Sequence, residues 1–225
     1  MNETSPPPAR LDYILWQLAD SAFPTGGFAH SNGLEAAWQH GEVRGRDDLL
    51  SFVETSLVQL GHGPLPLMLA AFDDPTHWTA VDAFAEAFLT NHVANRASRL
   101  QGRALLSAMD RIFKASASQT PPPDASFGHY APAFGAWMPR LNLPRTSAIR
   151  LFFFNHLRAT LAAAVRLNII GPMESQIMQY KLSSQAEKIG LECQNLGLHQ
   201  ATQTAPLLDL WQGAQDRLYS RLFQS

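Results

Sequence analysis

The sequence has very little cysteine, and this limits both its covalent chemistry and its location. Cys193 is the only cysteine, so no disulfide can form within the chain. Residues 1–10 are polar and proline-rich and do not resemble a secretory signal, so we expect them to form a disordered leader. Because disulfide-dependent proteins are typical of oxidising compartments, these features predict a reduced, cytoplasmic protein.

An uninterrupted hydrophobic run of membrane-spanning length is also missing. The most apolar stretch, residues 151–170, contains Arg158 and Arg166, and it also carries Asn155 and His156. Charged and strongly polar side chains are costly at membrane depth. We therefore predict a buried core helix here and no membrane interaction.

Charged residues make up only 16% of the 225 residues, and the formal net charge is −2. Nucleic-acid-binding domains are usually basic, so this balance argues against a nucleic-acid partner. A surface with few charges suggests that protein partners cover part of it. Alternatively, the aromatic residues and alanines fill a larger core.

Several catalytic and metal-binding patterns are missing as well. No Gly-Lys-Ser/Thr follows the glycines near residue 26, because Gly27 is followed by Phe28. There is no Gly-x-Ser-x-Gly, no Cys-x-x-Cys and no His-x-x-x-His among the eight histidines. We therefore predict a protein that is not an enzyme and holds no stable cofactor. These absences do not rule out a metal site whose ligands come from two subunits or from this chain and a partner.

Four polar side chains near the N-terminus, those of Asp20, Ser21, His30 and Ser31, are close together in sequence. A catalytic triad is defined by geometry, however, and proximity in sequence does not establish one. A rigid turn whose polar groups satisfy its own backbone is the simpler interpretation.

Apolar residues recur at helical spacing along the chain, and the alternation typical of strands is absent. The pattern predicts an all-α, single-domain bundle of about eight to ten helices within residues 11–225. The expected helices are 11–18, 34–40, 47–60, 64–72, 78–88, 93–112, 146–167, 174–189 and one from 206. The apolar face of the last helix continues through Leu218 and Leu222.

The most distinctive segment is residues 18–37, LADSAFPTGGFAHSNGLEAA. Pro24 ends the first helix, and glycines adopt backbone angles that other residues resist. Asn32 and Glu35 have the spacing of a capping box for the next helix. A structured loop is expected, with glycines at three positions: Gly26, Gly27 and Gly33.

This segment resembles the N-terminal motif of the urease accessory protein UreF family. The resemblance is carried by Asp20, Pro24, Gly26, Gly27, Phe28, His30, Ser31, Gly33 and Glu35. Four later blocks also resemble the family, in the same order: residues 91–103 with Arg96 and Arg99, 129–135 with Tyr130, 166–176, and 218–225 with Arg221, Leu222 and Phe223. These residues are our candidates for partner binding or structural motifs.

The resemblance implies an all-helical homodimer that acts as a urease maturation factor. Such proteins bind UreD (also called UreH) and with it recruit UreG, a GTPase that carries nickel. The assembly loads nickel into apo-urease, so nickel and GTP are handled by the complex. A stand-alone nickel metallochaperone, or an enzyme on a helical scaffold, is the alternative.

The roles of individual residues stay open at this level. Arg96, Arg99 and Arg103 lie nearly on one helical face. Three interpretations are possible. The arginines form a solvated stripe, they bind carboxylates of a partner, or one of them acts as an arginine finger for a partner GTPase. Phe28 stands where some family members carry tyrosine, so it can pack but cannot donate a hydrogen bond.

The last residues carry a separate hypothesis. An apolar chain end is unfavourable when exposed, and short termini fray. We therefore expect residues 218–225 to be mobile or loosely docked in the free protein. On binding UreD they would order, and Arg221 would then bond to carbonyls or a carboxylate near residues 21–33.

Overall fold

A computed structural model describes residues 8–113 and 127–225 of the chain. Within these ranges there are ten α-helices, four short 3-10 helices and no strand, which confirms the predicted all-α fold. The α-helices are α1 (Pro8–Ala19), α2 (Leu34–Gln39), α3 (Arg46–His62), α4 (Pro64–Asp73), α5 (Trp78–Phe88), α6 (His92–Phe113), α7 (Tyr130–Trp137), α8 (Arg145–Arg166), α9 (Pro172–Cys193) and α10 (Pro206–Ala214). The 3-10 helices are η1 (Gly27–Ala29), η2 (Pro139–Leu141), η3 (Leu198–Gln200) and η4 (Gln215–Arg217).

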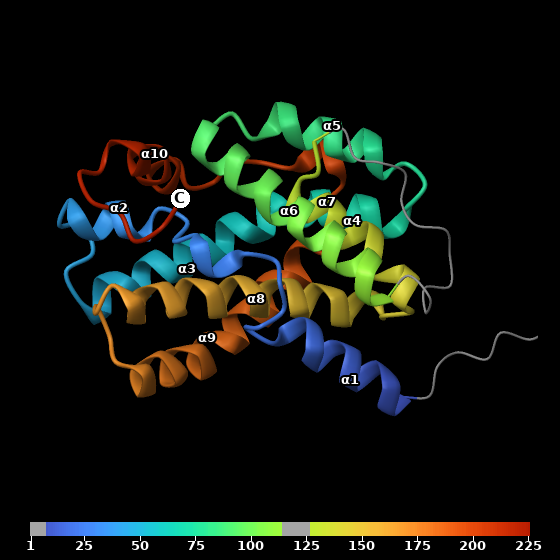
Figure 1. The fold of residues 1–225 in the computed structure, drawn as a ribbon, viewed down its shortest axis with the longest axis horizontal. Coiled ribbons are helices and arrows are strands. Elements are labelled where there is room, and N and C mark those ends of the chain that lie inside the picture. Colours follow the sequence, from blue (N-terminus) through green and yellow to red (C-terminus); the bar gives the residue numbers. More distant parts are fainter. Residues whose placement is uncertain (1–7, 114–126) are drawn as a thin grey trace, which may run out of the picture.

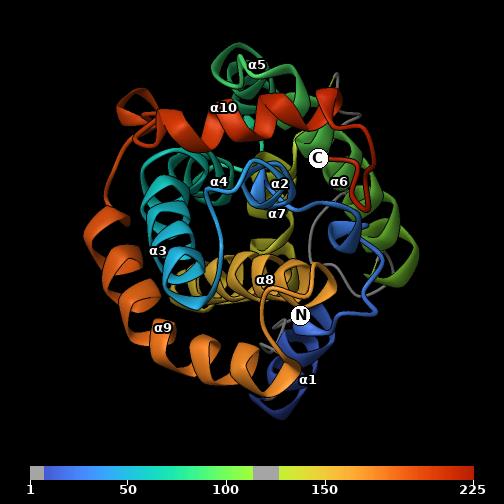
Figure 2. The same cartoon turned by 90° about the vertical axis from the view of Figure 1, so that its left-hand side faces the viewer.

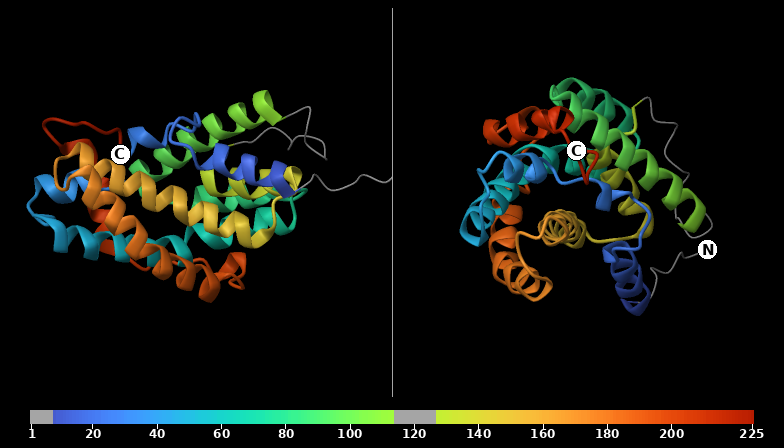
Figure 3. Two further views of the ribbon diagram at one scale, coloured as in Figure 1. Left: turned by 90° about the horizontal axis from the view of Figure 1, so that it is seen from below. Right: turned by 60° about the vertical axis from the view of Figure 1, so that its left-hand side comes forward.

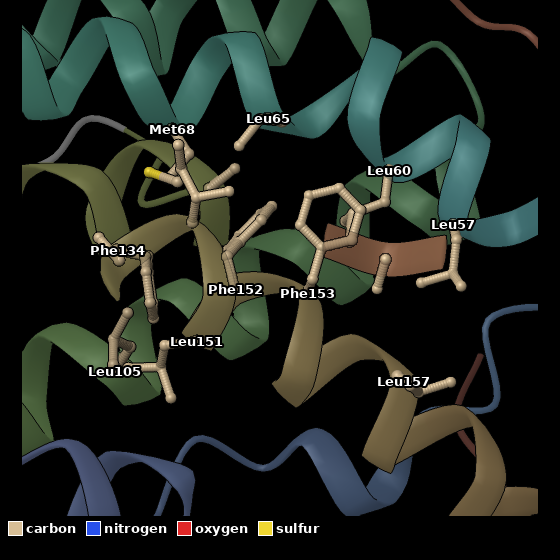
Figure 4. Close-up of a cluster of buried hydrophobic side chains, with 14 of the residues drawn as sticks. Leu57, Leu60, Leu65, Met68, Leu105, Phe134, Leu151, Phe152, Phe153 and Leu157 are labelled. Carbon is tan, nitrogen blue, oxygen red and sulfur yellow. The ribbon is translucent and has the colours of Figure 1, made fainter. Parts of the chain in front are cut away.

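Helix α8 is the central element of the bundle. It packs against α1, α2, α3 and α9, and the right-hand view of Figure 3 looks along it with the other helices around it. Its side chains Phe152, Phe153 and Leu157 are buried, and Figure 4 shows them facing α3 and α4. The prediction of a core helix is therefore confirmed. None of the described helices combines the length and apolar character needed to cross a membrane.

A close approach of two backbones fixes α7 against α4. A Cβ added to Gly135 would lie 2.0 Å from the carbonyl oxygen of Met68, so no larger residue fits without moving a helix. Every residue of α7 after Tyr130 is buried. This packing closes one end of the single hydrophobic core and fixes the position of His129, the residue before α7.

The bundle has two opposite faces formed by different parts of the chain. The views in Figures 1 and 2 place α10 and the end of the chain on one side, next to α2. Helices α1 and α9 lie on the opposite side, flanking α8.

Two expected boundaries are wrong. Helix α1 begins at Pro8, so residues 8–10 of the expected leader are helical, whereas residues 1–7 lie outside the described residues. The last helix ends earlier than its apolar pattern suggests, because α10 stops at Ala214 and residues 218–225 are not helical. The backbone N–H groups of Leu222 and Phe223 bond instead to Glu35 of α2, and that of Gln224 bonds to Ala29 in the loop before it.

Candidate partner-binding site

Residues 20–33, the glycine loop, connect α1 to α2 through a sequence of tight turns. The Asp20 carboxylate accepts the N–H of Ala22 at 2.9 Å, and Gly26 has a positive φ of 70°. Gly33 has φ 86°, and a Cβ there would lie 2.9 Å from the backbone nitrogen of Gln212. Gly33 is therefore required both by its own conformation and by its contact with α10.

The expected capping box is not formed. Asn32 has a left-handed φ of 55°, and the N-cap of α2 is Gly33, which provides no side-chain hydrogen bond. A capping side chain needs an extended backbone, so Asn32 cannot take that role. The hydroxyl of Ser31 instead accepts the N–H of Glu35 at 3.3 Å, and the Glu35 side chain turns elsewhere.

Residues 218–225, the tail, dock on the glycine loop. The backbone N–H of Gln224 donates to the carbonyl of Ala29 at 2.8 Å. The Ser31 hydroxyl donates to the Ser225 carbonyl at 2.9 Å, and His30 Nδ1 lies 2.7 Å from the Ser225 hydroxyl. Phe223 and Ser225 are buried. The tail was expected to be mobile or loosely docked, and the structure shows it docked on a surface that the chain itself supplies.

The buried carboxylate of Glu35 holds the tail from the α2 side. Its side chain is 1% exposed and accepts the backbone N–H groups of Leu222 at 2.7 Å and Phe223 at 3.1 Å. The side-chain amide of Gln215 donates to the same carboxylate at 2.6 Å. A buried carboxylate needs such donors, and charge-assisted hydrogen bonds are stronger than neutral ones.

A second carboxylate joins the tail to α6. Asp216 accepts two hydrogen bonds from Arg96, at 3.1 and 2.8 Å, and one from Arg221 at 3.1 Å. The hydrogen bond from Arg96 is the main cause of the lowered pKa of Asp216. Arg221 thus bonds to a carboxylate within the chain itself, that of Asp216 in η4, whereas its expected bond near residues 21–33 on binding UreD stays a prediction.

Arg166, at the end of α8, connects the loop and the tail directly. Its guanidinium lies 4.2 Å from the centre of the Phe223 ring and donates to the carbonyl of Phe28. The Phe28 side chain itself is 74% exposed. This role of Arg166 could not be predicted from local sequence, because residues 166 and 223 are neighbours only in the folded chain.

The other arginines of α6 are engaged elsewhere. Arg99 lies 3.7 Å from the Glu86 carboxylate and 5.7 Å from the centre of the Phe127 ring. Arg103 donates to the Phe127 carbonyl at 3.0 Å. With Arg96 bound to Asp216, all three arginines have partners within the chain. The structure therefore does not bring them together as a patch of free cations.

A buried polar network surrounds the start of α7, where Tyr130 lies. Asp82 accepts the N–H groups of Phe127, Gly128 and His129 at 2.8–3.0 Å. His129 in turn lies 2.9 Å from the Glu86 carboxylate. Tyr130 is half-buried, and burial raises its pKa to about 12. Sequence reasoning missed Asp82, since its partners lie more than forty residues away.

The described residues contain no group of three or more His, Cys, Asp or Glu side chains placed to hold a metal ion. The polar residues of the glycine loop also do not assemble as a triad. His30 and Ser31 both contact Ser225, and Asp20 contacts Ala22. These side chains serve to hold the loop and the tail together.

The fold and the site define an all-helical protein whose glycine loop and tail form one anchored surface. A family model described as UreF matches residues 43–183. The chain is 38% identical over 216 residues to Urease accessory protein F of Oryza sativa subsp. indica, covering 92% of this chain and 83% of that protein. It therefore belongs to the urease accessory protein UreF family.

Other relatives extend this similarity over almost the whole chain. Urease accessory protein F of Arabidopsis thaliana is 38% identical over 223 residues, which cover 96% of this chain and 93% of that protein. Urease accessory protein UreF of Mycobacterium tuberculosis (strain ATCC 25618 / H37Rv) is 31% identical over 214 residues, covering 94% and 98%.

The Glu35 contacts predict how the tail can be released. In Glu35→Gln, a side-chain NH₂ group would face the N–H donors of the tail, so we expect the tail to detach at a cost of about 1.5–3 kcal/mol. Limited proteolysis should then cleave within residues 218–225 much faster than in the wild type. Glu42→Gln, at an exposed position next to α2, is the control and should behave like the wild type. Equal cleavage of both variants would contradict the role of Glu35.

Two buried histidines predict a loss of stability in mild acid. Burial lowers the pKa of His156 and of His30 from 6.5 to about 4, and Arg96 adds to the effect at His30. Between pH 6.5 and 4 the unfolded chain therefore binds protons that the folded protein does not, so the free energy of unfolding falls as the pH falls. The pKa of Asp216 is lowered from 3.8, so its contribution to the free energy of unfolding is lost only when the pH falls below about 3.8.

Urea titrations at pH 7 and pH 5 measure this loss. His30→Asn and His156→Asn should each reduce it, and the double variant should reduce it further. A free energy of unfolding that stays constant in the wild type from pH 6.5 to 5 would show that the prediction is wrong.

Proposed function

We propose that this chain is a urease maturation factor that binds UreD (UreH) through the glycine loop and the tail. Membership of the UreF family indicates a role in urease maturation. The finer proposal is that the chain and UreD together recruit the GTPase UreG for nickel insertion into apo-urease. Nickel and GTP are then handled by the assembled complex, and this chain contributes surfaces and no chemistry of its own.

The observation that supports this proposal is a set of exposed apolar side chains on a backbone that is held by buried hydrogen bonds. Five large apolar side chains on the loop, α10 and the tail are exposed: Phe28, Leu207, Leu210, Tyr219 and Leu222. Exposed apolar groups gathered on one part of a protein mark interaction sites. The backbone beneath them is held by buried hydrogen bonds to Glu35 and Ser31. A partner would therefore meet a preorganised surface and would not have to order it.

We further propose that a second copy of the chain binds on the opposite face. Helices α8 and α9 enclose a groove of about 480 Å³, lined in part by Phe153, Phe154 and Tyr180. Several large apolar side chains of α1 and α9 are exposed on this side: Tyr13, Trp16, Met173, Ile177, Tyr180 and Leu191. A homodimer formed here would leave the glycine loop and the tail free, since Figure 2 places them on the other side.

Binding of UreD is tested by a charged substitution on the exposed tail. Tyr219→Asp should weaken co-purification with UreD by about 2–4 kcal/mol, or roughly 30-fold or more, because it places a carboxylate in an apolar interface. Tyr219 is fully exposed, so helix content by circular dichroism should not change. The control is Tyr180→Asp, on the opposite face, which should bind UreD normally. Undiminished binding by Tyr219→Asp would remove the tail from the interface.

Self-association is tested with the same two variants, with Tyr180→Asp now as the test variant and Tyr219→Asp as the control. Sedimentation of the wild type should give about twice the chain mass of 24.8 kDa. Tyr180→Asp should sediment as a monomer, because its 84% exposed ring would lie in the dimer contact. Tyr219→Asp should remain a dimer. A monomeric wild type at micromolar concentration would overturn the proposed homodimer.

A further inference from the structure

A cavity of about 290 Å³ lies beneath the glycine loop, bounded by α3, α6, α7 and α8. Alanines at 159, 162 and 163 keep the α8 side of this cavity open. Three polar side chains of α8 reach it: Asn155, His156 and Arg158. The volume is near the lower end of the range for small-ligand sites. None of these three side chains takes part in the docking of the tail.

Arg158 brings a charge into the cavity without a matching carboxylate. It is half-buried, and in the described part of the chain no ion pair joins it to an acidic side chain. Its Nε is buried and has no hydrogen-bond partner. Tyr130 and Asp20 are the acidic groups that act on its pKa, but the pKa of Tyr130 is raised to about 12, so its hydroxyl is neutral near pH 7, and Asp20 is exposed with its Oδ1 already accepting the N–H of Ala22. A buried guanidinium donor left unpaired is costly, so this group is suited to an acceptor from outside.

Asn155 supplies the complementary group. Its amide nitrogen donates to the carbonyl of Leu18 at 3.4 Å, and its side chain also acts on the Tyr130 hydroxyl, whose pKa it lowers against the larger effect of burial. Its Oδ1 is buried and has no hydrogen-bond partner. Asn155 and Arg158 are three residues apart on α8, so they occupy the same side of the helix. The cavity therefore presents one unpaired acceptor next to a cationic donor.

The remaining polar groups limit the kinds of ligand that the cavity can bind, because two of them already have partners in the chain. His156 Nε2 lies 2.6 Å from the Ser56 hydroxyl, and Arg166 is bound to the Phe28 carbonyl. The fixed charge of Arg158 disfavours a cation. A guanidinium matches the oxygens of a small oxyanion, while Asn155 Oδ1 requires a hydrogen from the same ligand.

We propose that Arg158 and Asn155 bind a small oxyanion that carries one O–H group, of the bicarbonate or hydrogen phosphate type. The guanidinium donates to the charged oxygens, and the ligand O–H donates to Asn155 Oδ1. The glycine loop covers the cavity, but Asn155 and Arg158 make none of the hydrogen bonds that dock the tail, so the proposal does not depend on the proposed binding of UreD.

Side-chain NMR of the ¹⁵N-labelled protein tests the proposal directly. The Arg158 Nε–H resonance is identified by its loss in Arg158→Lys, and that of Arg150 by its loss in Arg150→Lys. Bicarbonate and phosphate are titrated separately against chloride at constant ionic strength. We expect a saturable shift of the Arg158 resonance with at least one of them. Arg150 lies on the same helix but is paired with Glu187 outside this cavity, so its resonance should not move.

Nitrate and Asn155→Ala test the requirement for an O–H group. Nitrate is a planar oxyanion without a hydrogen, so it should shift the Arg158 resonance at least about tenfold more weakly. Asn155→Ala should weaken binding of the preferred anion by a similar factor and leave the response to nitrate unchanged. A response to only one of bicarbonate and phosphate identifies the ligand. No saturable shift with either, or an equal response to nitrate, would falsify the proposal.

Discussion

The buried carboxylate of Glu35 is the constraint on which the functional face depends. A carboxylate that is 1% exposed must be surrounded by donors, and three of its donors come from residues 215, 222 and 223, with a longer bond from Gln39 of α2 itself. Because residues 215, 222 and 223 lie at the far end of the chain, Glu35 couples α2 to the tail. The glycine loop is then held between them by the contacts of His30 and Ser31 with Ser225.

Helix α8 organises the molecule around this unit. Its apolar side chains form the centre of the core, its last residue Arg166 ties the glycine loop to the Phe223 ring, and its polar side chains Asn155 and Arg158 reach the cavity. The opposite side of the same helix forms the groove with α9. One central helix therefore separates the face that we propose for a different protein from the face that we propose for a second copy.

Most of the fold could be predicted from the sequence, but the details of the site could not. Helical periodicity located the helices, and the polar interruptions at Arg158 and Arg166 correctly indicated a core helix. The capping box was wrong because Asn32 adopts a left-handed conformation that its spacing to Glu35 does not reveal. The docking place of the tail could not be predicted, because its apolar pattern shows a need for burial but does not show which surface provides it.

The sequence by itself determined the features that depend on neighbours a few residues apart. Helix periodicity, turns at glycine and proline, and the absence of local metal-ligand spacing are all properties of short segments. Tertiary structure alone decided the pairing of Arg96 with Asp216, the pairing of Glu35 with the tail, and the cavity into which Asn155 and Arg158 reach. The physical reason is that these contacts are fixed by how α2, α6, α8 and α10 pack, and that packing is a property of the whole core.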